Sequence, residues 1–442
     1  MGLTPEQAAA AAARRARIME RLGDGVMLLP AAVERVRTAD IEYPFRQNSD
    51  FDYVTGFPEP DAVAVLAPAA EEKFVLFVRP RDPERAIWVG TRAGVEGAVD
   101  DYGADAAYPL EDLDKELPRW IGPATDIHVS LMRQDAVATR LLDVIRRAQA
   151  SRPRAGSGPM ATIRDPGALL HEMRLHKEPD ELARMRAAIT IACEAHREAM
   201  SRTRPGMMEY EVEALIDHTF RRRGATGPAY PSIVAGGANA TVLHYTTNDC
   251  PLGNDQLLLI DAGAELQGYC ADVTRTFPTG RRFTPAQRDL YDAVLASQLA
   301  AIGAVRPGVT LEDLHTIVLR VLVEALLGLG LLTEGSVDEA IEKETYKRLY
   351  MHRTSHWLGR DVHDVGAYQQ GGQPRPLAPD MVFTIEPGLY VPADADDLPE
   401  AFRGIGIRIE DDVLVTAAGH DVLSAAAPKH VEEIEALRAA AV

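Results

Sequence analysis

The sequence predicts an α/β (α+β) fold in two domains. A chain of 442 residues is too long for one ordinary hydrophobic core. Between residues 25 and 150, short β-like runs alternate with helical stretches, which predicts an N-terminal domain built on a mixed sheet. Beyond it, helices followed by paired strands occur twice, which indicates a second domain of two similar halves. We place the domains at residues 1–172 and 173–442.

The N-terminal segment predicts a surface helix rather than a targeting peptide. Thr4, Pro5 and Glu6 are typical of a helix start, and no Leu-rich segment or small-residue cleavage site follows the alanine run. The most apolar segment, residues 321–332, contains Glu324 and is too short to span a bilayer. We therefore expect a soluble, cytoplasmic protein with no membrane partner.

Five runs predict the strands of the first domain, namely GVMLLP, DAVAVLAP, KFVLFVRP, AIWVG and DIHVSL, and VATRLLDVIRRAQ predicts a helix. Residues 150–167 are rich in Pro, Gly, Ser and Arg and lack periodicity, so we expect an interdomain connection there.

The second domain is expected to open with two long helices, in KEPDELARMRAAITIACEAHREAM and YEVEALIDHTFRRRG. Strands are then predicted in SIVAGG, LLLID and YCADVTRTF, two helices at about 285–332, and the last strands in MVFTIEPG and GIGIRIEDDVLV.

Composition excludes several classes of function. The chain is 46% hydrophobic and 26% charged, as is typical of globular proteins. Its formal charge of −19 disfavours nucleic acid or an anionic membrane as a partner, because either requires a dense basic face. The three cysteines show no CxxC spacing, which indicates reduced thiols in a cytosol-like compartment.

Two aspartates interrupt β-patterned sequence in the second domain. Asp261 ends an aliphatic run, and Asp272 lies within the next strand-like run. Aspartate is a poor strand former and is costly to bury as a charge. A hairpin turning at Leu266 and Gln267 would set the two side chains opposite each other, about 5 Å apart. Like charges this close repel unless a cation lies between them, so the pair indicates a metal site.

Two glutamates strengthen this interpretation. Glu386 ends another aliphatic strand, and Glu410 lies two residues from Arg408, on the same strand face. Two strand pairs would then contribute two carboxylates each.

Histidines form the remaining part of the candidate site. His352, His356 and His363 lie within one short segment, and His244 precedes the first aspartate strand. Arg353 occupies the position where an HExxH zinc helix needs its glutamate, so that motif is excluded.

The donor set favours two divalent ions that share bridging carboxylates. Four carboxylates and one imidazole are too oxygen-rich for one tetrahedral zinc and too many for a magnesium ion that keeps its waters. Manganese fits best, and cobalt or zinc could substitute. Two such ions would activate water for hydrolysis of a carbonyl or phosphoryl centre. Nucleophile-elbow, P-loop and EF-hand motifs are absent from the sequence.

Motifs in order along the chain resemble the aminopeptidase P (Xaa-Pro aminopeptidase) branch of the pita-bread metallopeptidases, family M24. The resemblance covers nearly the whole chain and is carried by RQNSDFDYVTGFPEPDAV, HYTTND, LIDAGAELQGYCADVTRTFP, SHWLGRDVHDVG, TIEPGLY and RGIGIRIEDD. It implies an aminopeptidase P-type domain at 1–172 and a catalytic pita-bread (creatinase/aminopeptidase-like) domain at 173–442. It further implies metal-dependent removal of the first residue from peptides with proline at position 2.

The resemblance also implies a role for each candidate residue. Asp272 and Glu410 would bridge two ions, usually manganese, with His356 and Glu386 on one ion and Asp261 on the other. Glu386 would also transfer the proton from water to the leaving nitrogen. The remaining implied residues are His363, His244 and Arg408 for catalysis, His352 and Tyr390 for substrate, and Trp88 and Asp40, which a homo-oligomer (dimer or tetramer) would bring to a neighbouring active site.

Two arginines depart from the family pattern. Arg353 replaces a small residue, commonly glycine, and Arg360 replaces an apolar one. We expect Arg353 either to pair with Asp361 or Asp364, which we favour, or to bind a substrate carboxylate. Carboxylate binding would point toward a prolidase that cleaves Xaa-Pro dipeptides. The other alternative is a catalytically inactive pita-bread module that binds peptides.

Overall fold

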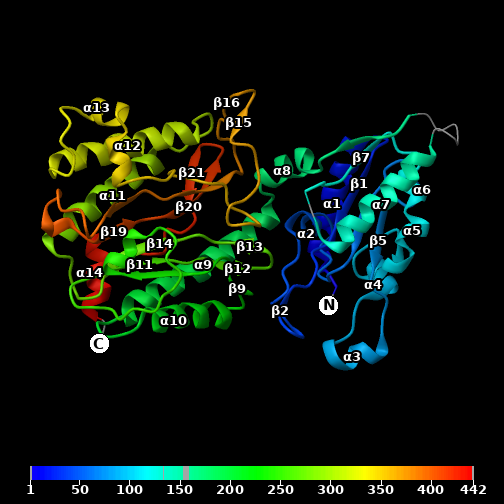
Figure 1. Cartoon of the computed structure of the whole chain (residues 1–442), viewed down its shortest axis with the longest axis horizontal. Coiled ribbons are helices and arrows are strands. Elements are labelled where there is room, and N and C mark those ends of the chain that lie inside the picture. The colour runs from blue at the N-terminus through cyan, green and yellow to red at the C-terminus, as the bar shows by residue number, and fades with distance from the viewer. Residues whose placement is uncertain (1, 133, 153–158, 441–442) are drawn as a thin grey trace. The chain divides into compact units, whose positions relative to one another are not determined.

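The computed structural model describes residues 2–132, 134–152 and 159–440, and the chain divides into two compact units, Met1–Glu172 and Met173–Val442 (Figure 1). Helix α8 (Gly167–Leu175) contains the division between them. Among the described residues, no helix has the length and apolarity needed to cross a membrane. All three cysteines are free thiols, as the sequence predicts.

A six-stranded mixed sheet forms the centre of the first unit. Its strand order is β6-β5-β4-β1-β7-β8, with antiparallel pairing of β1, β4 and β5 and parallel pairing elsewhere. The strands are β1 (Val26–Pro30), β4 (Val63–Leu66), β5 (Phe74–Val78), β6 (Ala106–Pro109), β7 (Asp126–His128) and β8 (Thr162–Arg164). Strand β8 lies within the stretch expected to be a connection, of which residues 153–158 are outside the described residues.

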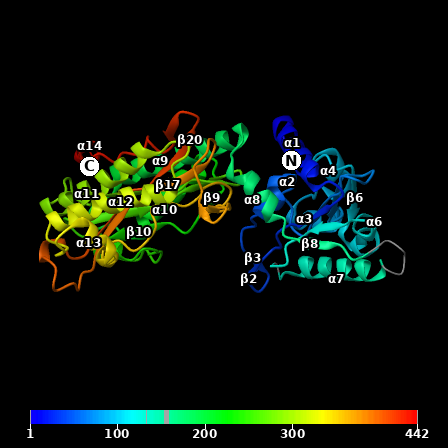
Figure 2. The same cartoon turned by 90° about the horizontal axis from the view of Figure 1, so that it is seen from above.

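Helices cover both faces of this sheet. Figure 2 shows α1 (Pro5–Leu22) and α7 (Ala136–Ser151) on opposite sides of it. Helix α1 begins as predicted, because the Thr4 side chain accepts a hydrogen bond from the Gln7 amide and caps the helix. The smaller elements are β2 (Val36–Thr38), β3 (Ile41–Glu42), α2 (Ser49–Thr55), α4 (Gly94–Asp100), α5 (Leu113–Glu116) and α6 (Pro118–Ile121).

One predicted strand of the first unit is wrong. The run AIWVG belongs to helix α3 (Pro83–Val89). Asp82 caps this helix by accepting hydrogen bonds from the amides of Glu84 and Arg85, and proline occupies the first turn. This local start signal outweighs the strand preference of the β-branched and aromatic residues that follow.

The second unit contains two sets of helices followed by antiparallel strands. The first set comprises α9 (Pro179–Arg202), α10 (Glu209–Arg222), β10 (Ile233–Gly236), β11 (Leu257–Asp261) and β14 (Thr274–Pro278). The second comprises α11 (Pro285–Ala304), α12 (Leu311–Gly328), β17 (Val382–Ile385), β18 (Gly388–Val391), β19 (Ile405–Arg408), β20 (Asp411–Thr416) and β21 (Gly419–Val422), before α14 (Val431–Ala440). In Figure 1, α9 and α10 lie on one side of β11 and β14, and α11 and α12 on the other.

The two sets meet edge to edge at the strands that carry the candidate ligands. Thr274 and Glu410 form a backbone bridge, and the Thr276 hydroxyl donates to the Arg408 carbonyl at 2.9 Å. Carboxylates at the strand ends of both sets are thereby brought to one place.

Candidate metal centre

The hairpin that carries the two aspartates turns one residue later along the chain than predicted. Its turn is Gln267–Gly268, and both residues have positive φ, 51° and 76°. Such a two-residue turn matches the twist of the flanking strands β12 (Ala264–Leu266) and β13 (Tyr269–Cys270), and glycine favours it. Asp261 therefore pairs with Thr274, whereas the prediction placed it opposite Asp272.

The aspartates nevertheless come together, because Asp272 lies just before β14 on the same side. The hydroxyl of Tyr230 lies 2.6 Å from Asp261 Oδ1 and 2.5 Å from Asp272 Oδ1. Tyr230 is a residue that the sequence did not single out.

The other predicted ligands close around these aspartates. Side-chain donor atoms of Asp272, His356 and Glu410 all lie within 4.8 Å of one another. His356 Nε2 is 3.3 Å from Asp272 Oδ2 and 3.4 Å from Glu386 Oε1. Asp261 Oδ2 accepts a hydrogen bond from Arg408 at 2.6 Å. The structure thus gathers all five predicted ligands, which lie far apart in sequence.

Burial and mutual repulsion dominate the electrostatics of this cluster. Burial raises the pKa of Glu386 to about 7. Burial, reinforced by the charges of Asp272 and Glu386, also holds the pKa of Glu410 well above its ordinary value. Burial alone would lower the pKa of His356, but its hydrogen bond to Asp272 and the charge of Glu386 raise it to about 9. Three buried carboxylates and the partly buried Glu386 around one imidazole fit divalent cations, which would oppose the repulsion directly.

The cluster opens into a cavity of about 450 Å³. Its walls include His244, His352 and His363, together with apolar side chains such as Ile233 and Val362. The His363 ring lies 4.5 Å from that of His356, nearly perpendicular to it. The three clustered histidines of the prediction, His352, His356 and His363, and the separate candidate His244 therefore all line one cavity.

Tyr390 lies behind this wall. Its hydroxyl is 2.9 Å from His352 Nε2 and accepts a hydrogen bond from Arg408 at 3.0 Å. Burial lowers the pKa of His352 to about 4, so its ring is neutral near pH 7. Tyr390 thus holds two side chains that border the cavity.

Arg353 borders the cavity, but its predicted partners are wrong. It pairs with Glu312 at 2.9 Å, and its side chain remains 69% exposed. Asp361 and Asp364 are instead occupied by Arg174, at 2.8 and 2.5 Å.

Arg360 lies outside the cavity. Its side chain is buried and donates to the Tyr269 hydroxyl at 3.0 Å, with the guanidinium over the Tyr269 ring. Its role is therefore in packing.

Two further predicted residues belong to the first unit. Trp88 is 86% exposed on α3, and Asp40 is exposed in the turn between β2 and β3. Neither is among the residues that line the cavity of the second unit.

Four carboxylates and an imidazole that converge on one side of a cavity define a metal-dependent hydrolase. Comparison with known proteins narrows this class. The model of metallopeptidase family M24 matches residues 183–417, and that of the aminopeptidase P N-terminal domain matches residues 11–129. The chain belongs to metallopeptidase family M24, as the sequence motifs predicted, and the predicted fold class is confirmed.

Similarity to individual members extends over the full length. The chain is 44% identical to the Xaa-Pro aminopeptidase of Escherichia coli (strain K12), over 97% of each chain. It superposes on the structure of Pseudomonas aeruginosa aminopeptidase PepP with a TM-score of 0.96 and 45% identity, covering 100% of this chain and 99% of that one. Zinc-substituted E. coli aminopeptidase P in complex with product gives a TM-score of 0.94 at 41% identity, over 100% of both chains.

Proposed function

We propose that this protein is a Xaa-Pro aminopeptidase that releases the first residue from peptides with proline at position 2. The observation that carries the proposal is the convergence of five ligand-type side chains and three histidines on one cavity. The similar E. coli (strain K12) protein is named for this activity. The Xaa-Pro bond requires a specialist, because it is a tertiary amide without an N–H for a general protease to bind.

The proposed cofactor is a pair of divalent ions, manganese by preference, with cobalt or zinc as substitutes. Asp272 and Glu410 would bridge both ions, His356 and Glu386 would hold one, and Asp261 the other. When bound, the ions supply an activated water and polarise the scissile carbonyl. Thr274 supports this arrangement, since its hydroxyl donates to Glu410 Oε2 at 2.6 Å and fixes that carboxylate.

The protein side chains provide proton transfer and charge stabilisation. Glu386 would move a proton to the departing proline nitrogen. His244 and His363, on the cavity wall, would donate hydrogen bonds to the tetrahedral intermediate. Arg408 bonds to both Asp261 and Tyr390, which supports a role in holding ligands and cavity wall in place.

The remaining proposals concern substrate and assembly. His352 and Tyr390 would border the proline pocket, and Arg353 would lie at its mouth. Trp88 and Asp40 would reach a neighbouring active site in a homo-oligomer, a dimer or tetramer. The exposed Ile87 and Val89 beside Trp88 support burial of this helix by a partner. We place the enzyme in the cytoplasm.

An assay with manganese-loaded protein tests the function. Xaa-Pro-Xaa tripeptides should be cleaved after the first residue, and a chelator should abolish this activity reversibly. Cleavage of Xaa-Pro dipeptides alone would instead indicate a prolidase, and no chelator-sensitive cleavage would indicate an inactive module.

A single variant tests the role of the histidine wall. His363→Ala should reduce turnover about a hundredfold or more, because one donor to the intermediate is lost. Metal content should stay unchanged. A parallel loss of metal would make His363 a ligand and contradict the proposed coordination.

A further inference from the structure

His244 is carried into the cavity by the irregular segment that follows β10. This segment begins with a short 3-10 helix, Gly237–Thr241, and the His244 side chain is exposed. Among the described residues, the structure gives the His244 ring no hydrogen-bond partner. Its position therefore depends on how the surrounding backbone is held.

One buried carboxylate holds that backbone from both sides. Glu209, the first residue of α10, is fully buried. Its Oε1 accepts hydrogen bonds from the Gly236 amide at 2.8 Å and the Asn239 side chain at 2.9 Å. Its Oε2 accepts from the Tyr245 hydroxyl at 2.8 Å and the Cys250 amide at 2.9 Å. Two of these donors precede His244 and two follow it.

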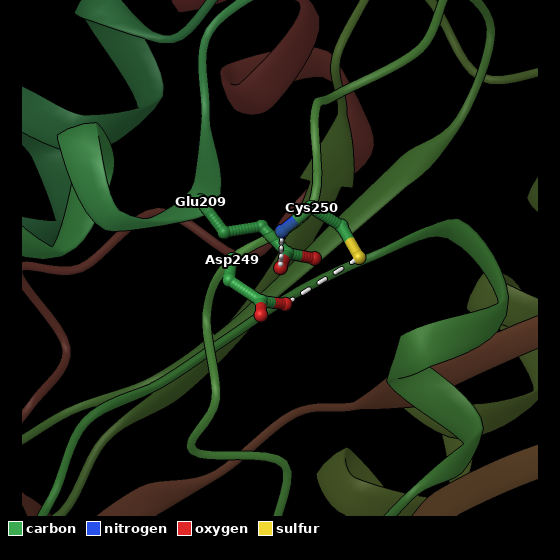
Figure 3. A group of neighbouring side chains, drawn as sticks. All are labelled: Glu209, Asp249 and Cys250. Atoms are coloured by element: carbon green, nitrogen blue, oxygen red, sulfur yellow. Dashed lines mark hydrogen bonds between the residues drawn. The ribbon is translucent and has the colours of Figure 1, made fainter.

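The same cluster could be taken for a second metal site. Figure 3 shows Glu209 beside Asp249 and Cys250, whose donor atoms lie within 4.8 Å of one another. A carboxylate has about four acceptor positions, and protein donors fill all four on Glu209. No lone pair of Glu209 is left for an ion, so the cluster is an anchor and not a metal site.

A second anchor fixes only the far end of the segment. Asn248 adopts a left-handed backbone, φ 49°, and its side chain bonds to the backbone of Val234 and Ser232. The bond between Tyr245 and Glu209 is the side-chain anchor nearest to His244 in sequence.

We propose that Glu209 is a positioning residue that holds the His244 imidazole toward the cavity. This inference depends on the catalytic role proposed for His244. A glutamine at position 209 would turn an NH₂ group toward two of the present donors, and the backbone N–H among them, of Gly236 or of Cys250, cannot become an acceptor, so at least one of the four anchors would be lost. The segment would then sample positions in which His244 no longer reaches the intermediate.

Glu209→Gln tests the inference, with Glu211→Gln as the matched control. Glu211 lies on the same helix and accepts a hydrogen bond from the Met208 amide, which a glutamine oxygen can keep. Glu209→Gln should lower kcat about tenfold while KM changes less than about twofold, because the missing interaction belongs to the transition state. Metal content should stay at the wild-type level, and the control should retain wild-type turnover.

A double-mutant cycle separates positioning from general stability. In a His244→Ala background, Glu209→Gln should cost less than about twofold further, because the group it positions is gone. If the fold-losses of the two single variants multiply in the double variant, or if Glu209→Gln lowers the metal content, the positioning role of Glu209 is refuted and the catalytic role of His244 is not affected. Wild-type turnover in His244→Ala itself would refute the role of His244. If Glu209→Gln fails to fold, Tyr245→Phe, which removes a single donor, should show the same lack of additivity.

Discussion

Replacing Arg353 by glycine tests whether this arginine selects peptides with a free carboxylate near the scissile bond. In the structure the guanidinium is 69% exposed and its partner Glu312 is 53% exposed. Exposed ion pairs contribute about 0–1 kcal/mol, so Arg353→Gly should change the free energy of unfolding by no more than about 1 kcal/mol. Since the pair is weak, the guanidinium can exchange Glu312 for a substrate carboxylate.

The expected kinetic effect is larger than the effect on stability. A hydrogen bond to a charged group contributes about 1.5–3 kcal/mol, which corresponds to roughly a tenfold to hundredfold rise in KM when it is lost. We expect this rise in Arg353→Gly for Xaa-Pro-Xaa tripeptides with a free C-terminal carboxylate, whereas a rise confined to Xaa-Pro dipeptides would point toward a prolidase. The same peptides with a C-terminal amide should bind equally well to both proteins.

The assay compares KM for each acid and its amide in wild type, Arg353→Gly and Glu312→Gln. The last variant removes the competing carboxylate, so it should lower KM for the acids. Equal changes for acids and amides would refute the carboxylate contact, and a loss of several kcal/mol in stability would show that the exposed pair is structural.

Three further outcomes follow from the buried charges. Glu410→Ala should retain less manganese than Asp261→Ala in elemental analysis after dialysis, because a bridging ligand serves both ions; equal retention would contradict the proposed bridge. Asp364→Asn leaves the buried Lys177 without its carboxylate and Arg174 with Asp361 alone, so urea unfolding should show a loss on the order of 3–5 kcal/mol, and a loss below about 1 kcal/mol would be inconsistent with this network. Burial lowers the pKa of His315 to about 4, so the unfolded chain takes up a proton first as pH falls below about 6.5 and the native state loses stability. When pH is lowered from about 7.5 to about 5, the free energy of unfolding should therefore fall by about 2 kcal/mol less in His315→Gln than in wild type. An equal fall in both proteins would exclude His315 as a cause of the pH dependence of stability.

The sequence singled out two of the five candidate ligands because each is an acidic residue placed where an aliphatic strand ends. Asp261 and Glu386 were visible in this way, since a charge after four buried positions needs a compensating partner. The turn was predicted one residue too early, so the predicted partner of Asp261 is two residues from Thr274, its partner in the structure, because turn geometry favours Gly268 and the aspartate pattern does not indicate the turn position.

Other features depended on contacts between distant segments. Tyr230 lies between Ala229 and Pro231, shortly before strand β10, so nothing local marked it as the residue between two aspartates. The partners of Arg353 were mispredicted because Arg174, far away in sequence, takes both expected acids. Sequence spacing predicts which side chains share a strand face. It does not predict which cation pairs with a given acid, because the candidate cations come from segments that only folding brings together.

The single hydroxyl of Tyr230 has a consequence for how the site fills. It carries one hydrogen but lies within bonding distance of both Asp261 and Asp272, so only one of these contacts can be its donation. Burial and the charge of Asp261 raise the pKa of Asp272, so its carboxyl group holds a proton more readily than an exposed one, and a divalent ion would displace that proton. Metal binding would therefore release a proton, and the affinity for metal would rise with pH. The concentration of free protons in the cell thus helps to set how much of this enzyme is loaded.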